Sequence, residues 1–274
     1  MTAKTHPVQF VGAGPGDPDL ITVKGQQALA VADLVIYAGS LVPEAVLKWA
    51  PSKARKLNSA GMTLEEVTAA MTPAWRDGGR VVRLHTGDPS LYGAIFEQMA
   101  ELNRRGIPFR IVPGVTAAFA AAAAMGIEYT LPEVSQTLII TRMEGRTPVP
   151  EKEALAALAA HQATMVIYLS VGMLDKVVSV LQQAYGPTAA CAVVYRASQP
   201  DEAVVCAPLD RLTDAVARAG IERQAVIVVG RVLEVSLESL RHKSRLYDAG
   251  FSHGFRESRS YDGAATQHDG KGQS

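Results

Sequence analysis

The sequence has few cysteines and no excess of charge of either sign. Only Cys191 and Cys206 occur among 274 residues, which excludes a disulfide framework and a zinc site built from several cysteines. We expect both thiols to be buried as small apolar groups. Basic and acidic residues number 27 each, so no chain-wide positive field exists to attract nucleic acid or an anionic membrane. An anionic ligand would have to be bound by a local group of basic side chains.

Long hydrophobic runs are absent as well. The longest apolar stretches, residues 117–125 and 163–174, are shorter than the roughly 20 residues that span a bilayer. The first residues lack the apolar core of a signal peptide, so we expect a cytoplasmic protein without a membrane partner. Hydrophobic residues nevertheless make up 48% of the chain, enough for a buried core in each of about two domains. A mainly disordered chain is therefore excluded.

Short apolar runs bounded by glycine and proline alternate with helical stretches, as in α/β proteins with largely parallel sheets. The expected strands are residues 8–12, 34–37, 80–85 and 109–112, then 137–141, 165–169, 192–195, 203–206 and 225–229. The expected helices are residues 22–31, 63–77, 90–105, 117–125, 175–184 and 209–219. We predict two α/β domains, 1–116 and 117–246.

The final residues, 247–274, differ in composition from the two domains. They are rich in glycine, serine and charge, and too few of them are apolar to offset the cost of ordering a chain. We expect this tail to be largely mobile. Residues 246–247 and 251–255 hold most of its aromatic surface, and we expect them to dock on the body of the protein.

A glycine-rich turn follows the first expected strand, at residues 12–17. It differs from a dinucleotide-binding fingerprint, because Asp17 stands where the last glycine is needed and Gly39 stands where the second strand would end in an acid. No Gly-Lys-Ser/Thr follows, so a P-loop is excluded. The turn either binds a ligand at the carboxyl end of the strand or merely links the strand to a helix.

Two further turns follow expected strands, at residues 86–90 and 113–117. In the first, Asp88 and Pro89 indicate a helix start, with Asp88 acting either as a cap or as a ligand contact. In the second, Thr116 is a natural N-cap. Carboxyl ends of parallel strands meet at one edge, so the three turns point to a shared crevice. Neither metal-ligand spacing nor a Gly-x-Ser-x-Gly nucleophile motif is present.

Three of these segments together carry a family resemblance. Residues 11–25, 86–90 and 112–117, in this order, resemble the tetrapyrrole methylases, which use S-adenosylmethionine. Within that family, residues 37–42 and 244–256 are similar to the precorrin-4 C11-methyltransferases. The resemblance implies methylation of precorrin-4 at C-11, giving precorrin-5 in cobalamin biosynthesis. The alternatives are cobalt-precorrin-4, another precorrin or a sirohaem precursor, or a carrier that binds the tetrapyrrole without methylating it.

The same resemblance implies where the cofactor binds and how the reaction runs. It places S-adenosylmethionine, and the product S-adenosylhomocysteine, in a cleft between two α/β domains, where a ring carbon displaces the methyl group without a metal or a covalent intermediate. The family's cofactor contacts fall on Pro15, Gly87, Asp88, Leu91, Thr116, Ala117, Leu169 and Ala197. We take Asp88 and His85 as candidate positioning residues and assign no general base.

The substrate and the subunits complete the set of expected partners. A tetrapyrrole of this kind carries several carboxylates, so the cleft should hold basic side chains. The candidates near the motif ends are Lys24, Arg83, His85, Arg142, Arg146 and Arg196. Each could instead be a solvated or structural residue, and His85 could face either the core or a ligand. The family also implies a homodimer, and the neutral charge argues against a nucleic-acid partner.

Overall fold

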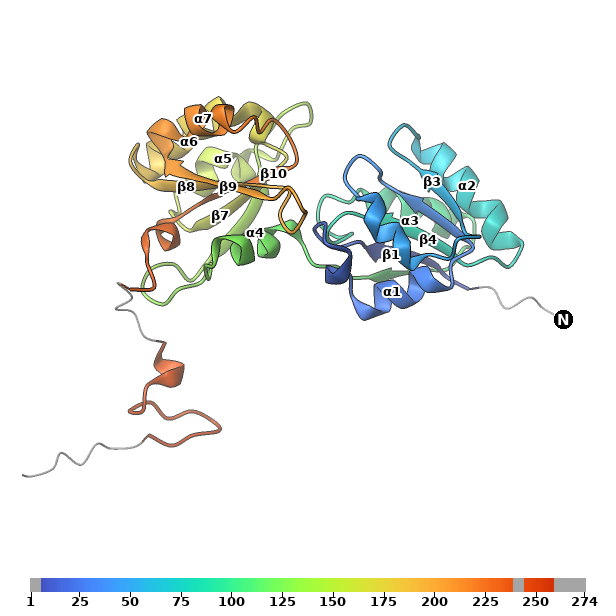
Figure 1. The fold of residues 1–274 in the computed structure, drawn as a ribbon, viewed down its shortest axis with the longest axis horizontal. Coiled ribbons are helices and arrows are strands. Elements are labelled where there is room, and N and C mark those ends of the chain that lie inside the picture. The colour runs from blue at the N-terminus through green and yellow to red at the C-terminus, as the bar shows by residue number, and fades with distance from the viewer. Residues whose placement is uncertain (1–5, 239–243, 259–274) are drawn as a thin grey trace, which may run out of the picture.

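The computed structural model describes residues 6–238 and 244–258, and each of its two lobes is built on one five-stranded sheet (Figure 1). The first sheet uses residues between 8 and 112, and the second uses residues between 138 and 229. The predicted α/β fold with two sheets is confirmed. The exact division of the chain after Thr116 stays a prediction.

All strands of the first sheet are parallel, in the order β3-β2-β4-β1-β5. The strands are β1 (Val8–Gly12), β2 (Leu34–Tyr37), β3 (Arg55–Asn58), β4 (Val81–His85) and β5 (Phe109–Val112). The sequence predicted four of them and missed β3. That strand reads Arg-Lys-Leu-Asn and lies at an edge of the sheet, so it has no apolar pattern by which it could be recognised.

Helices cover both faces of the first sheet. One face holds α1 (Val23–Ala30), whose Leu29 is buried against strand residues such as Val11 and Leu84. The other face holds α2 (Leu64–Arg76) and α3 (Ile95–Arg104), which bury Met71 and Leu102 against β1 and β2. Burial on both faces explains why β2 is a continuous apolar run and why β1 and β4 are mainly apolar.

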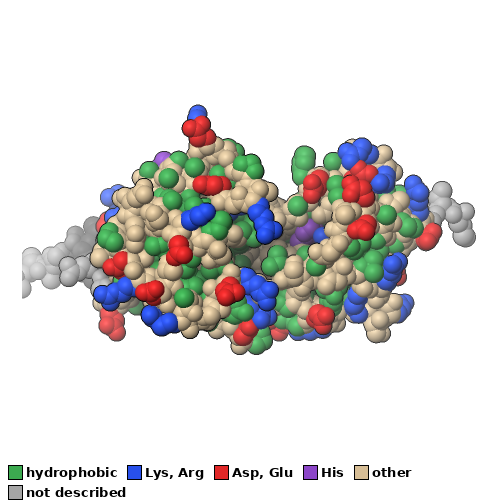
Figure 2. All heavy atoms as spheres, turned by 90° about the horizontal axis from the view of Figure 1, so that it is seen from above, with side chains coloured by type: hydrophobic (Ala, Val, Ile, Leu, Met, Phe, Trp, Pro, Cys, Tyr) green, Lys and Arg blue, Asp and Glu red, His purple; other side chains and the backbone are tan. Residues whose placement is uncertain are grey.

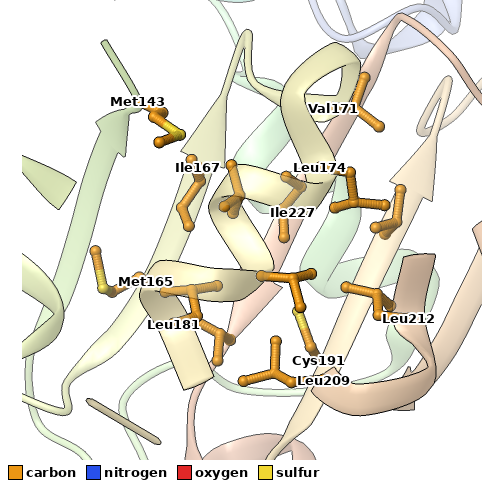
Figure 3. Packing of buried hydrophobic residues seen from close by; sticks show 14 of the residues in the cluster. Met143, Met165, Ile167, Val171, Leu174, Leu181, Cys191, Leu209, Leu212 and Ile227 are labelled. Atoms are coloured by element: carbon orange, nitrogen blue, oxygen red, sulfur yellow. The ribbon is translucent and has the colours of Figure 1, made fainter. Parts of the chain in front are cut away.

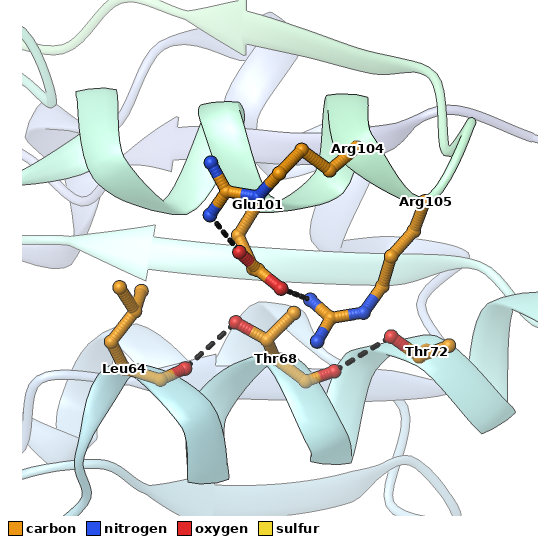
Figure 4. A network of polar contacts seen from close by, with 6 residues as sticks. All are labelled: Leu64, Thr68, Thr72, Glu101, Arg104 and Arg105. Atoms are coloured by element: carbon orange, nitrogen blue, oxygen red, sulfur yellow. Dashed lines mark hydrogen bonds and ion pairs between the residues drawn. The ribbon is translucent and has the colours of Figure 1, made fainter.

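Polar side chains on α2 and α3 form hydrogen bonds and ion pairs with residues three or four positions away in the chain (Figure 4). The hydroxyls of Thr68 and Thr72 on α2 donate to the carbonyls four residues before them, at 2.7 and 2.8 Å. On α3, Glu101 pairs with both Arg104 and Arg105, one helical turn further on. Thr68 and Thr72 can therefore lie buried without an unpaired hydroxyl.

The prediction of a helix over residues 90–105 is wrong for its first five residues. The helix α3 begins only at Ile95, and residues 86–94 form a loop in which Tyr92 and Ala94 have positive φ angles of 55° and 47°. A left-handed backbone cannot continue a right-handed helix. Asp88 and Pro89 therefore lie in a loop rather than at a helix start.

The second sheet is mixed, with the order β6-β7-β10-β8-β9. Its strands are β6 (Leu138–Arg142), β7 (Thr164–Tyr168), β8 (Ala190–Tyr195), β9 (Ala203–Pro208) and β10 (Ala225–Val229). Only β6 and β7 are parallel, whereas β10 runs antiparallel to β7 and β8, and β9 antiparallel to β8. The expectation of largely parallel sheets is wrong here, because β8 and β9 are joined by a short connection without a crossover helix.

Helices also enclose the second sheet (Figure 1). One face is covered by α5 (Leu155–Ala159), α6 (Leu174–Tyr185) and α7 (Leu209–Arg218), and Leu181 and Leu212 meet Ile227 of β10 in this core (Figure 3). The other face is covered by α4 (Ala117–Met125), whose buried alanines pack on β7, β8 and β10. Small side chains allow this helix to approach the sheet closely.

The cysteines differ in environment. Cys191 on β8 is buried, which raises the pKa of its thiol, whereas Cys206 on the edge strand β9 is exposed. The prediction that both are buried is wrong for Cys206, because alternate side chains of an edge strand face solvent. No helix in the described residues is long and apolar enough to cross a membrane.

The described part of the tail, residues 244–258, lies away from the second sheet (Figure 1). Tyr247 and Phe255 are 84% and 100% exposed. The expectation that these aromatic rings dock on the body is therefore wrong for this chain taken alone, in which the segment bonds to itself, for example between His253 and Arg256. The expected mobility of the tail concerns mainly residues 259–274, which lie outside the described residues.

Candidate functional site

Three loops meet at the carboxyl edge of the first sheet. They are the first loop (residues 13–17), the second loop (residues 86–94) and the third loop (residues 113–116), which follow the adjacent strands β1, β4 and β5. The first two loops are joined by a pair of backbone bonds between Gly14 and Gly87, at 2.9 and 3.3 Å. The structure therefore brings together the three turns that the sequence pattern assigned to one crevice.

Glycines make this contact between the loops possible. A Cβ atom on Gly114 would lie 2.2 Å from the Gly87 carbonyl oxygen and 2.8 Å from the Gly12 Cα. A Cβ atom on Gly12 would lie 2.6 Å from the Gly114 Cα, and Gly87 has a positive φ of 58°. No side chain fits at Gly12 or Gly114, and the backbone angle of Gly87 disfavours any residue but glycine. The floor of the crevice is consequently built from backbone, in which Gly14 and Gly87 bond to each other.

Asp88 ties the second loop to the third. One carboxylate oxygen accepts from the backbone N–H of Ser90 at 2.8 Å, and the other accepts from the N–H of Gly114 at 2.9 Å. Both oxygens are thus engaged by the protein itself. The prediction of a helix cap is wrong, since Asp88 caps no helix and instead fixes two loops of the crevice, whereas its predicted contact with a ligand stays a prediction.

The other residues of the first lobe that are predicted to contact the cofactor lie in these three loops or directly after them. Pro15 is buried in the first loop, and Leu91 is half-buried in the second, where its N–H donates to the Asp88 carbonyl at 3.2 Å. Thr116 and Ala117 are half-buried at the start of α4. Thr116 is the N-cap residue as predicted, but its hydroxyl makes no bond to its own helix and instead lies 2.6 Å from the Tyr168 hydroxyl.

Two predicted contacts come from the second lobe, and they differ in exposure. Leu169 follows β7, has a positive φ of 55° and is 63% exposed. Ala197 follows β8 and is buried in the core beside α4, so only its backbone could meet a ligand. Its neighbours Arg196 and Ser198 have positive φ angles of 44° and 67°. Strained backbone of this kind in residues other than glycine is concentrated at functional sites.

The loop after β8 contacts the first loop directly. The Ser198 hydroxyl accepts from the backbone N–H of Asp17 at 3.0 Å, and the Gln199 side chain donates to the Pro15 carbonyl at 3.5 Å. A Cβ atom on Gly16 would lie 2.2 Å from the Gln199 Cγ. The carboxyl edge of the first sheet therefore faces the second lobe. Figure 2 shows the surface hollowed between the lobes, with Lys and Arg side chains along the rim.

His85 and Arg83 lie on the same face of β4, beneath this edge. His85 is 4% exposed, and burial together with the nearby Arg83 lowers its pKa to about 3, so the ring is neutral at pH 7. Its Nε2 atom is buried without a hydrogen-bond partner. Burial also lowers the pKa of Arg83 to about 10, and its guanidinium donates to Gln98 and to the Ile36 carbonyl. Arg83 is therefore a structural residue, which corrects its place among the candidates for substrate carboxylates.

The other predicted basic residues also separate into two groups. Arg196 pairs with Asp201 at 2.6 Å and donates to Gln199 at 2.8 Å, so its charge is already compensated, and it too is corrected to a structural role. Arg142, at the end of β6, donates to the Thr147 and Pro148 carbonyls and forms no ion pair with a described residue. Lys24 and Arg146 are exposed. These last three keep a charge that a carboxylate ligand could meet.

The chemistry that this arrangement supports is binding and positioning. Within the described ranges, no group of three His, Cys, Asp or Glu side chains is placed to hold a metal ion. Each oxygen of Asp88 accepts from a backbone N–H group, which orients this carboxylate as a structural acceptor between two loops. The crevice instead presents backbone groups, apolar walls and a basic rim.

Sequence reasoning missed several residues of the site. Tyr92 and Tyr168 pack with their ring centroids 5.7 Å apart, and Ser198 and Gln199 join the lobes. Tyr168 directly precedes the predicted contact Leu169, so its place at the end of β7 was a usable signal. No pattern in the sequence marked Ser198 and Gln199, because their partners in the first loop are more than 180 residues away.

Comparison with known proteins gives a consistent set of relatives. Residues 7–213 match the model of the tetrapyrrole (corrin/porphyrin) methylases. The cobalt-precorrin-4 C(11)-methyltransferase of Methanocaldococcus jannaschii is 52% identical over 252 residues, which cover 92% of this chain and 96% of that protein. The precorrin-4 C(11)-methyltransferase of Pseudomonas aeruginosa is 50% identical over 226 residues, which cover 82% of this chain and 90% of that protein.

Solved structures show the same similarity. The X-ray structure of a cobalt precorrin-4 methyltransferase superimposes with a TM-score of 0.81 at 48% identity, covering 83% of this chain and 95% of that one. Uroporphyrin-III C-methyltransferase from Thermus thermophilus, solved with S-adenosylhomocysteine, gives a TM-score of 0.70 at 28% identity, covering 85% of this chain and 99% of that one. The two-lobed arrangement of this chain is thus shared with methyltransferases.

Proposed function

Since this chain belongs to the tetrapyrrole (corrin/porphyrin) methylase family, we propose that it transfers a methyl group from S-adenosylmethionine to C-11 of precorrin-4, giving precorrin-5 in cobalamin biosynthesis. The observation that carries the proposal is the crevice of three glycine turns, which faces the second lobe. The chain that forms this crevice is 50–52% identical in sequence to proteins named as C(11)-methyltransferases of precorrin-4 or cobalt-precorrin-4. The resemblance seen in the sequence motifs leads to the same family.

The crevice fits S-adenosylmethionine in its chemistry. Its floor of packed glycines lets a ligand approach the backbone closely, and exposed Leu169 offers an apolar surface to that ligand. When bound, the cofactor supplies an activated methyl group on a sulfonium. We assign the contacts to Pro15, Gly87, Asp88, Leu91, Thr116, Ala117, Leu169 and Ala197, with Ala197 acting through its backbone.

The protein's own part in the reaction is to hold the two reactants in line. A ring carbon of the reduced macrocycle is already nucleophilic, so rate acceleration depends on distance and orientation. Asp88 contributes by fixing the second loop to the third through two backbone bonds. His85 stays neutral beneath the crevice and keeps a free Nε2 atom, which makes it the second positioning candidate.

The carboxylates of the macrocycle need cationic partners at the rim. We assign this role to Arg142, Arg146 and Lys24, whose charges form no ion pair with described residues. The Arg142 guanidinium is already held by loop carbonyls, so little entropy would be lost when it binds a carboxylate. The proposal also includes a homodimer and a cytoplasmic location, in keeping with the composition and the family.

The test is methyl transfer from labelled S-adenosylmethionine to purified intermediates. Precorrin-4 and cobalt-precorrin-4 are offered separately, because the relatives include enzymes named for each. We expect label to appear at C-11 of precorrin-4. Transfer only to cobalt-precorrin-4 would show that the enzyme acts on the cobalt-bearing substrate. Transfer to precorrin-2 but to neither form of precorrin-4 would overturn the assignment.

A further inference from the structure

Tyr168 reaches from the second lobe to the third loop. It is the last residue of β7, and its hydroxyl oxygen accepts from the backbone N–H of Ala118 at 2.6 Å and lies 2.6 Å from the Thr116 hydroxyl. Ala118 is the second residue of α4, so its N–H is one of the donors that a helix leaves unpaired at its start. Thr116, the N-cap residue, makes no such bond itself. The phenol therefore caps α4 from the neighbouring strand β7.

Either hydroxyl could donate in the contact between Tyr168 and Thr116, and the bond from Ala118 to Tyr168 favours Tyr168 as the donor. The Tyr168 oxygen already accepts from Ala118, and its proton has the Thr116 oxygen as a partner at hydrogen-bond distance. If Tyr168 donates to Thr116, the Thr116 proton is directed away from the helix. Burial raises the pKa of the Tyr168 phenol, so the group keeps its proton at neutral pH. Thr116 is then a donor at the point where we place the cofactor.

The Tyr168 ring also contacts the second loop. The rings of Tyr168 and Tyr92 lie 5.7 Å apart at an angle of 48°. Tyr92 has a positive φ of 55° and its side chain is 43% exposed. A strained residue of this kind persists only where its surroundings hold it in place. Tyr168 is therefore the side chain of the second lobe that touches both the second and the third loop.

We propose that Tyr168 is a positioning residue for the cofactor: its hydroxyl orients the Thr116 hydroxyl as a hydrogen-bond donor toward S-adenosylmethionine and fixes the start of α4. The inference rests on the proposed function, because it takes the three loops as the cofactor site. It adds a residue from the second lobe whose effect on the cofactor passes through Thr116.

The experiment measures the affinity of purified full-length protein for S-adenosylhomocysteine by calorimetry, together with the thermal midpoint. Tyr168→Phe keeps the ring and its contact with Tyr92 but removes the hydroxyl. We expect affinity to fall about 3- to 10-fold, the usual effect of losing one hydrogen bond. Thr116→Val should have an effect of similar size, whereas Thr116→Ser keeps a hydroxyl and should bind almost like the wild type.

Tyr129→Phe is the matched control. The Tyr129 hydroxyl donates to the carbonyl of the same residue, Ala118, at 2.6 Å, and does not touch the third loop. Its loss should lower the thermal midpoint at least as much as Tyr168→Phe, with affinity within about twofold of the wild type. The double variant Tyr168→Phe/Thr116→Val should bind no more weakly than Thr116→Val alone, since both changes remove one chain of interactions.

The possible results lead to different conclusions. If Tyr168→Phe binds like the wild type and only its midpoint falls, the residue is purely structural and the inference is wrong. If the effects of Tyr168→Phe and Thr116→Val multiply in the double variant, Tyr168 does not act through Thr116, and the inference is again overturned. A wild-type protein that does not bind S-adenosylhomocysteine would reject the proposed function itself, and the inference with it. Should Tyr168→Phe not fold, the comparison of Thr116→Val with Thr116→Ser still decides whether a donor is needed.

Discussion

The carboxylate of Asp88 accepts a hydrogen bond from the backbone N–H of Gly114 at 2.9 Å, and through it the loop after β4 is held to the loop after β5. The two residues are 26 positions apart in the chain, and a sheet with β1 between β4 and β5 brings them together. A charged acceptor on a backbone donor is among the stronger hydrogen bonds of a protein. The shape of the cofactor crevice therefore depends on this contact.

The first prediction concerns that carboxylate. Asp88→Ala removes acceptors for both Ser90 and Gly114, and we expect the affinity for S-adenosylhomocysteine to fall at least 10-fold. The free energy of unfolding should fall by about 1–3 kcal/mol, the range for hydrogen bonds to a charged group. Asp88→Asn keeps one acceptor oxygen, so its affinity and its unfolding free energy should lie between those of the wild type and those of Asp88→Ala. Calorimetry and denaturant unfolding measure these effects, and normal affinity in a destabilised Asp88→Ala protein would make the residue purely structural.

The second prediction concerns the packed glycines. Gly114→Ala would place a Cβ atom 2.2 Å from the Gly87 carbonyl oxygen, and the neighbouring backbone cannot move aside without opening the crevice. We expect a loss of about 3 kcal/mol or more in unfolding free energy, or no folded protein. Gly61→Ala is the control, because nothing lies within 4 Å of that position, and it should change stability by less than about 0.5 kcal/mol. Equal stability of the two variants would contradict the tight packing.

The third prediction concerns the contact between the lobes. Gly16→Ala would place a Cβ atom 2.2 Å from the Gln199 Cγ, which is part of a flexible side chain. Gln199 should turn away and lose its bond to the Pro15 carbonyl, so cofactor affinity should fall about 3- to 10-fold. In the double variant Gly16→Ala/Gln199→Ala the clash disappears, and affinity should be no lower than in Gln199→Ala alone. Additive losses in this double-mutant cycle would show that the two residues do not interact.

The fourth prediction is a pH dependence that originates in His85. Its pKa is lowered from 6.5 to about 3 in the folded protein, so between these values the unfolded chain binds more protons than the folded one. The free energy of unfolding should therefore decrease as the pH falls from 6.5 toward 3, with His85 contributing up to about 1.4 kcal/mol per pH unit. Stability from this source is fully present above pH 6.5.

Substitution isolates that contribution. His85→Gln should reduce the difference in bound protons between the unfolded and folded states by about one over this interval. The unfolding free energy should therefore depend less steeply on pH than in the wild type. His161→Gln removes an exposed histidine and serves as the control. Denaturant unfolding at several pH values gives both slopes. An unchanged slope in His85→Gln would mean that the ring takes up a proton in the folded state, contrary to its burial.

The sequence by itself determined the fold class and the position of the crevice formed by the three glycine turns. Glycine has properties that no neighbouring residue can supply, so the turns around Gly12, Gly87 and Gly114 are visible in the sequence without a structure. Parallel strands with two buried faces are mainly apolar runs, which is why β1, β2 and β4 were recognised. The sequence did not reveal β3, because an exposed edge strand has no apolar pattern.

Tertiary structure alone decided which polar side chains serve the site. Local sequence offered Asp88 as a helix cap or a ligand contact, and Arg83 and Arg196 as candidates for substrate carboxylates or as structural residues. The fold gives Asp88 the Gly114 N–H, buries Arg83 and pairs Arg196 with Asp201. The partner of a side chain depends on which strands are neighbours and on how the two lobes meet. Contacts between residues far apart in the chain leave no local pattern, so the link from Tyr168 to the start of α4 became visible only in the folded protein.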